Sequence, residues 1–154
     1  MKKTTQTTST LAIILLVASL FLMNGCKKPV DDAPSPEEQQ VTRLSKTWNV
    51  ESVTFGGSED RTADWSGFSL TVTANKTYST SGAFSPGPWP TSGTWDFAQD
   101  GDAVNINKVV RDDGLEVSIS VSETALTMTF TFDDTIHNGG RAEAVSGEYV
   151  FKMK

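Results

Sequence analysis

The sequence predicts an all-β protein, an eight-stranded antiparallel up-and-down barrel with a short N-terminal helix. Three observations support this fold class. Apolar and polar residues alternate with a period of two from residue 48 onward, as in strands that are buried on one face. The alternating runs number eight, and their connections alternate between tight turns and long loops. A helix-capping sequence precedes the first run.

The chain begins with the features of a secretory signal. Met1-Lys2-Lys3 supplies basic charge, and an apolar run of 13 residues follows over 11–23. A run of that length is too short to cross about 30 Å of hydrocarbon as a permanent helix. We therefore expect residues 1–25 to be a signal peptide that is removed.

Cys26 is the only cysteine and directly follows this segment. The stretch Leu22-Met23-Asn24-Gly25-Cys26 resembles a bacterial lipoprotein box, in which a peptidase cuts before the cysteine and its sulfur carries lipid. The resemblance implies a triacylated Cys26 that holds the mature protein on a membrane, because two or more acyl chains make attachment effectively permanent. The alternative is a secreted protein with a free thiol, a liability in an oxidising compartment.

We expect the mature chain to be one domain that follows a short tether. Residues 26–34 comprise the lipidated cysteine and a charged, proline-bearing linker, and residues 35–154 form the barrel domain. Ser35-Pro36-Glu37-Glu38 has the pattern of a capping box, which predicts a helix through about Lys46 with Val41 and Leu44 on one face.

The charge of the chain bears on its partners. The full sequence has 13 basic and 19 acidic side chains, and loss of Lys2 and Lys3 with the signal leaves 11 basic ones, a net charge of −8. A polyanion such as nucleic acid is bound mainly through basic side chains. We therefore expect no nucleic-acid partner.

The eight predicted strands lie at 48–55, 67–74, 77–84, 92–98, 103–110, 115–122, 125–132 and 144–153. The first run changes parity, since Trp48 and Val50 alternate on one face and Val53 and Phe55 on the other. This predicts a β-bulge between the two pairs.

The connections set the polarity of the barrel. Those at 75–76, 99–102 and 123–124 are tight turns, whereas 56–66, 85–91 and 133–143 are long. In an up-and-down order all the long connections fall at one end. Eight strands enclose a space that side chains fill or that holds one small ligand. Such a barrel could also cross an outer membrane, but its strands are short for a span and an anchor on Cys26 would add little.

The sequence resembles lipocalin-like lipoproteins of the kind common in Bacteroidota. Residues 44–50, LSKTWNV, are similar to the Gly-x-Trp opening of the first lipocalin strand, with Lys46 where glycine is usual. Residues 92–95 and 147–151 are similar to later strands of that group, although Ser122-Glu123-Thr124 replaces its Thr-Asp-Tyr turn. The resemblance implies that Trp48 plugs the base of the barrel beneath the helix.

Little in the sequence indicates an enzyme or a metal site, and we expect no catalytic residues and no cofactor. His137 is the only histidine and lies in a glycine-containing loop, no Gly-x-Ser-x-Gly occurs, and zinc would need more ligands than His137 and Cys26 provide. The acidic clusters at 100–102, 112–114 and 133–134 lack the spacing of a calcium loop, and Asp-Gly favours turns. Calcium binding at these clusters stays an alternative.

Binding of a small apolar or amphipathic ligand at the long-loop end is the favoured hypothesis. Gly82, Gly93 and Gly147 fall on the inward parity and are expected to leave room, and Lys108 is the one charged residue on that parity. Lys108 would either reach the rim or meet a ligand anion. The predicted ligand-binding residues are Phe55, Phe68, Phe84, Trp95, Lys108, Val110, Phe130 and Phe132 in the walls, with Trp65 and Trp89 on the lids.

A second hypothesis is a surface module that binds a glycan or a protein while the barrel core is filled. Trp65 and Trp89 lie in loops, and prolines flank Trp89, so either ring could form a rigid exposed platform. Alternatively both rings fold back and cap the barrel. In each case we expect a monomer, anchored in the outer membrane, on the periplasmic face or at the cell surface.

Overall fold

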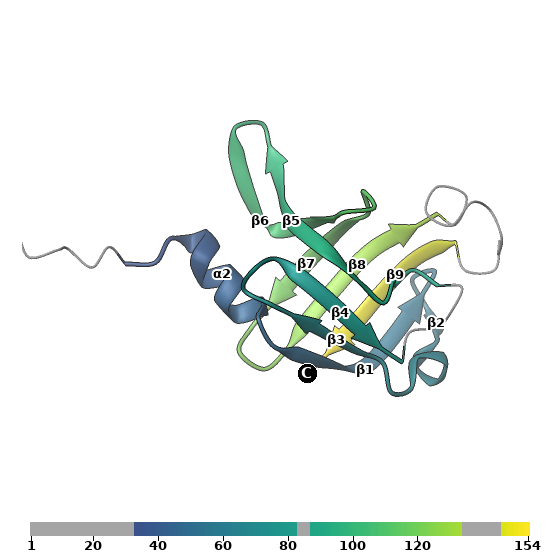
Figure 1. Cartoon of the computed structure of the whole chain (residues 1–154). Coiled ribbons are helices and arrows are strands. Elements are labelled where there is room, and N and C mark those ends of the chain that lie inside the picture. The colour runs from purple at the N-terminus through teal and green to yellow at the C-terminus, as the bar shows by residue number, and fades with distance from the viewer. Residues whose placement is uncertain (1–32, 83–86, 134–145) are drawn as a thin grey trace, which may run out of the picture. The chain divides into compact units, whose positions relative to one another are not determined.

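The computed structural model describes residues 33–82, 87–133 and 146–154 (Figure 1). The predicted signal peptide, Cys26 and most of the tether lie outside these residues, as do Phe84 and His137. Residues Pro34–Lys154 form one compact unit.

The helix α2 (Pro36–Leu44) begins with the predicted capping box. Ser35 Oγ accepts a hydrogen bond from the Glu38 backbone N–H at 3.2 Å, and the Ser35 backbone N–H donates to Glu38 Oε2 at 2.7 Å. Two backbone donors that a helix start leaves unpaired are thereby satisfied. Gln40 and Leu44 form the buried face of the helix.

The predicted eight-stranded barrel is confirmed, with one short strand added. Neighbouring strands of the barrel are antiparallel, and pairing of β1 with β9 closes it, while β2 pairs only with the end of β1. The strands in the described residues are β1 (Thr47–Phe55), β2 (Glu59–Asp60), β3 (Ser69–Val72), β4 (Thr77–Ser81), β5 (Ser92–Asp100), β6 (Ala103–Arg111), β7 (Glu116–Val121), β8 (Leu126–Phe132) and β9 (Gly147–Met153).

Two details of β1 agree with the sequence. The register of β1 against β9 shifts between Val50 and Ser52, which places the predicted bulge. Trp48 is fully buried, and its indole N–H donates to the Leu44 carbonyl at 3.0 Å. Trp48 therefore closes the base of the barrel beneath α2, at the end with the tight turns.

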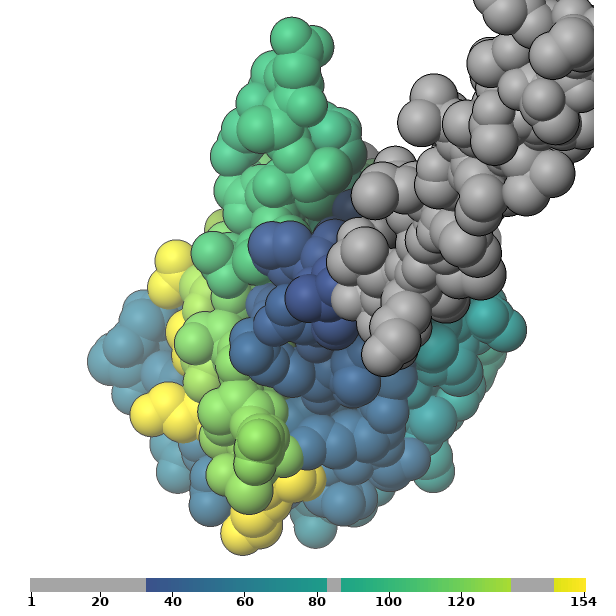
Figure 2. All heavy atoms as spheres, turned by 90° about the vertical axis from the view of Figure 1, so that its left-hand side faces the viewer, coloured from purple at the N-terminus to yellow at the C-terminus, as the bar shows by residue number. Residues whose placement is uncertain are grey.

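The β5–β6 hairpin projects beyond the barrel (Figures 1 and 2). Strand β4 pairs only with the first residues of β5, and β6 pairs with β7 only over Lys108–Val110. Helix α2 contacts both β6 and β7 here, and Gln40 Nε2 donates to the Ile106 carbonyl at 3.0 Å. The helix α2 thus packs where β6 and β7 separate.

An irregularity in this hairpin reverses the parity of β6. Phe97 pairs with Val109 and the next residue, Ala98, pairs with Asn105, so that residues 106–108 stand opposite no residue of β5. As a result Val109 and Arg111 are buried in the barrel. The predicted inward orientation of Lys108 and Val110 is wrong, because alternation was extended through this irregularity.

The room expected at the inward glycines is already filled. A Cβ on Gly93 would lie 2.6 Å from the Tyr78 hydroxyl oxygen, and one on Gly147 would lie 2.6 Å from the Phe55 ring. A Cβ on Gly82 would meet the Gly67 carbonyl oxygen at 2.5 Å. These glycines permit close packing, and the position that a Cβ would take at each of them is already occupied.

Candidate functional site

The long-loop end of the barrel is filled by an aromatic cluster, which we define as Trp65, Phe68, Trp89, Phe130, Tyr149 and Phe151. Ring centroids lie 4.8 Å apart for Trp65 and Phe151 and 5.7 Å apart for Trp89 and Phe130, and both pairs meet edge to face. These are favourable aromatic geometries within a packed core. Among the described residues, these rings fill the space in which the pocket at the long-loop mouth was predicted.

The loop tryptophans belong to this core. Trp65 lies in a 3₁₀ helix (Thr62–Trp65) between β2 and β3 and is 3 % exposed, and Trp89 precedes β5 and is 6 % exposed. Both fold back over the barrel, so neither ring forms an exposed platform in this conformation. Phe68, Phe130 and Phe132 are likewise buried, and Phe55 is half-buried against Tyr149 at 4.9 Å.

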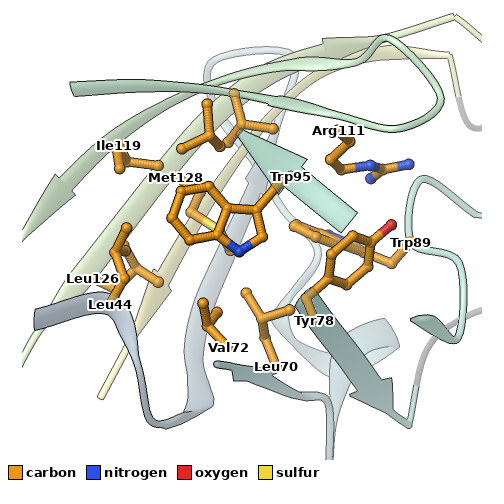
Figure 3. A pocket seen from close by; sticks show the side chains of 12 residues that line it. Leu44, Leu70, Val72, Tyr78, Trp89, Trp95, Arg111, Ile119, Leu126 and Met128 are labelled. Atoms are coloured by element: carbon orange, nitrogen blue, oxygen red, sulfur yellow. The ribbon is translucent and has the colours of Figure 1, made fainter. Parts of the chain in front are cut away.

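An apolar cavity of about 40 Å³ lies deeper in the barrel, nearer to α2 (Figure 3). We call it the barrel cavity. Of the predicted ligand-binding residues that the structure describes, a set that leaves out Phe84, only Trp89 and Trp95 reach it. The residues lining it are Leu44, Leu70, Val72, Tyr78, Trp89, Trp95, Val109, Arg111, Val117, Ile119, Leu126 and Met128.

Arg111 is the charged residue in the wall of the barrel cavity, and its side chain is 2 % exposed. Its Nη1 donates to the Pro88 carbonyl at 2.5 Å, and its Nε and Nη2 bond both oxygens of Asp113. The guanidinium also lies 5.1 Å from the centroid of the Trp89 ring. Arg111 therefore holds the loop segment that carries Trp89 against the barrel.

Sequence reasoning missed Arg111 because it was placed just beyond the end of its strand. The signal available was a lone arginine directly before the Asp112-Asp113-Gly114 turn, a spacing that allows a local ion pair. Only the β6 irregularity turns this side chain inward.

Three polar atoms in the cavity-lining side chains are buried without a hydrogen-bond partner among the described residues. They are the Tyr78 hydroxyl and the indole nitrogens of Trp89 and Trp95. Burial raises the pKa of Tyr78 to about 12, with Arg111 opposing and Asp112 adding to the rise, so the phenol stays protonated at neutral pH. All three atoms are thus hydrogen-bond donors in a wall that is otherwise mostly apolar.

The remaining predicted wall residues lie elsewhere. Lys108 faces outward and pairs with Glu116 at 3.1 Å, with 34 % of its side chain exposed. Val110 is half-buried and lies outside the lining of the barrel cavity. The reading in which Lys108 meets a ligand anion inside the barrel is therefore wrong.

The acidic turns at 100–102 and 112–114 have structural roles within the chain, whereas Asp134 of the third cluster lies outside the described residues. Gly101 adopts a φ of +64° in the β5–β6 turn, as an Asp-Gly turn requires. Asp112 Oδ2 accepts from the Thr94 backbone N–H at 3.1 Å, and Asp113 binds Arg111. Within the described residues no three acidic, histidine or cysteine side chains gather in a group that could hold a metal ion.

Comparisons with known proteins add no assignment. No family model matches the chain, and neither a curated protein nor a solved structure matches it. Over the described ranges, no helix combines the length and apolarity needed to span a bilayer.

Proposed function

We propose that this protein is a lipoprotein, anchored in the outer membrane through lipid on Cys26, whose barrel binds a small apolar or amphipathic molecule in the barrel cavity. The anchor is supported by the sequence around Cys26 and by the signal-like segment before it. We place the proposed site in the barrel cavity and not at the long-loop mouth, because the aromatic cluster fills the mouth.

The observation that carries the binding proposal is the barrel cavity with its buried, unpartnered donors. A wall of packed side chains normally leaves neither space nor unpaired polar atoms. Its volume of about 40 Å³ is well below the roughly 300–1,000 Å³ of typical ligand pockets. The ligand is therefore compact, or a side chain is displaced when the ligand enters. Trp89 is the candidate for this displacement, because it is the lining residue that lies on a loop.

The anchor is tested by expressing the full chain in a bacterium that is grown with an alkyne-bearing fatty acid and detecting label on the protein. The intact chain should carry label and fractionate with the outer membrane. Cys26→Ser should carry none, and equal labelling of the two would refute the anchor.

The binding site is tested with residues 27–154, which include the compact unit and omit the predicted signal and lipid. Cyclopentane, benzene and toluene are titrated while the indole ¹H–¹⁵N resonances are recorded. Resonances of Trp89 and Trp95 should move, and that of Trp48, already bonded to Leu44, should not. If none of the probes moves them, the cavity does not bind ligands of this class.

A second candidate function is a surface module that binds a protein or a glycan with the barrel core filled. The filled long-loop end and the projecting β5–β6 hairpin, where Val104 is 41 % exposed, favour it. The burial of Trp65 and Trp89 removes its proposed platform. A glycan array read with and without Val104→Asp would test the hairpin as a contact surface.

A further inference from the structure

We propose that the molecule bound in the barrel cavity carries a neutral hydrogen-bond acceptor, such as a carbonyl or ether oxygen, which the indole N–H of Trp95 binds. This inference rests on the proposed function and names the class of ligand. It excludes a pure hydrocarbon and a carboxylate as the preferred ligand.

Trp95 is the donor best placed for this role. The residue is 7 % exposed and lines the cavity, and its indole nitrogen has no acceptor among the residues described. Figure 3 shows the nitrogen on the edge of the ring that faces Leu70 and Val72, away from Arg111. An N–H held among such groups loses its bond to water without replacement, which is unfavourable. A ligand oxygen at this position would restore that bond.

The other two donors extend the same pattern towards Arg111. Figure 3 places the Tyr78 hydroxyl on the side of its ring nearest the guanidinium. The Tyr78 and Trp89 ring centroids lie 6.1 Å apart. Both polar atoms are donors at neutral pH, and neither has a partner among the described residues. The two indole N–H groups can only donate and the Tyr78 hydroxyl can donate as well as accept, so donors are in excess in the wall, which favours a ligand that carries an acceptor.

The charges around the cavity favour a neutral acceptor over an anion. Arg111 already binds both oxygens of Asp113 and the Pro88 carbonyl, which leaves little of its charge for a ligand. A Cβ on Gly93 would lie 2.6 Å from the Tyr78 hydroxyl and 2.7 Å from Asp112 Oδ1, so a second carboxylate lies close to this corner. An anion would lose its hydration there and meet two carboxylates.

The experiment uses two probes of nearly the same shape, cyclopentanone and methylenecyclopentane, which differ in a C=O and a C=CH₂ group. Both are titrated into residues 27–154, and the indole ¹H shift of Trp95 is followed. Cyclopentanone should move this resonance downfield, as a new hydrogen bond does, whereas methylenecyclopentane should not. Trp48 serves as the internal reference because its N–H is bonded to Leu44.

A variant pair separates the hydrogen bond from hydrophobic affinity. Trp95→Phe should weaken cyclopentanone about three- to tenfold more than it weakens methylenecyclopentane, the ratio expected for one net hydrogen bond. Trp65→Phe is the matched control, because Trp65 is buried but does not line the cavity, and it should change both affinities equally. The direct shift in the unaltered chain remains decisive if Trp95→Phe fails to fold.

The outcomes distinguish this inference from the proposed function. If both probes bind but move the Trp95 resonance alike and lose affinity alike in Trp95→Phe, the acceptor inference is wrong and the cavity still binds ligands. Tighter binding of cyclopentanecarboxylate than of cyclopentanone would overturn the preference for a neutral group. If no probe binds, the inference and the proposed binding site both fail.

Discussion

Replacement of Arg111 by methionine should be among the most destabilising single substitutions in the barrel. The change removes the donor to the Pro88 carbonyl and both bonds to Asp113. A buried carbonyl left without a donor costs about 1–3 kcal/mol. The side chain of Asp113 is 28 % exposed, so its lost ion pair adds less than a fully buried pair would. We expect a loss of about 3 kcal/mol, which is roughly 12 °C in Tm for a domain of this size.

The assay is urea unfolding followed by tryptophan fluorescence, with the midpoint compared at constant slope. Lys108→Met is the matched control, because it removes a cation from the same strand whose ion pair with Glu116 is largely exposed. It should cost about 0.5 kcal/mol or less. Arg111→Met should also increase acrylamide quenching of Trp89. A loss below about 1 kcal/mol for Arg111→Met, or equal losses for the two variants, would refute the role of Arg111.

Three further predictions concern the barrel cavity and its surroundings. Gly93→Ala should destabilise the barrel by about 1–3 kcal/mol, because its Cβ would lie 2.6 Å from the Tyr78 hydroxyl oxygen. Adding Tyr78→Phe should restore part of the lost stability. Urea unfolding midpoints of the single and double variants check both expectations. Burial raises the pKa of Tyr78 to about 12, so the contribution of the protonated phenol to the free energy of unfolding is fully present below pH 10. This contribution should fall by about 2 kcal/mol as the pH rises from 10 to 12. The free energy of unfolding, measured by urea titration from about pH 10 to about pH 12, should fall less in Tyr78→Phe than in the unaltered chain. Val72→Ile should stabilise by about 0.5–1 kcal/mol by filling the cavity, whereas Val121→Ile, outside its lining, should change little; a loss in Val72→Ile would contradict the cavity.

Local patterns account for the parts of the fold that were predicted correctly. The capping box at Ser35 and Glu38 depends on residues three apart, and the alternation in β7 and β8 depends on residues two apart. Such signals need no knowledge of distant segments. The bulge in β1 was visible for the same reason, since the change of parity between Val50 and Val53 lies within one strand.

The candidate site could be predicted only in part. Trp95 was expected in the wall of the barrel and Trp89 on a lid, and both line the barrel cavity, as large aromatic side chains are rarely left in water. Their position within the barrel was not predictable, since it depends on which aromatic rings from other segments occupy the long-loop end. Phe68, Trp89 and Phe130 meet there from three separate segments of the chain.

The sequence by itself therefore determined the strand order, the helix that precedes the first strand and the grouping of the long connections at one end. These follow from short-range periodicity and from the antiparallel order that tight turns impose. The tertiary structure alone decided which side chains face the barrel cavity. Residues 106–108 of β6 stand opposite no residue of β5, and this irregularity turns Arg111 inward and Lys108 outward. Because a shift of one residue exchanges the two faces of a strand, pairing between distant segments decided what one-dimensional alternation could not.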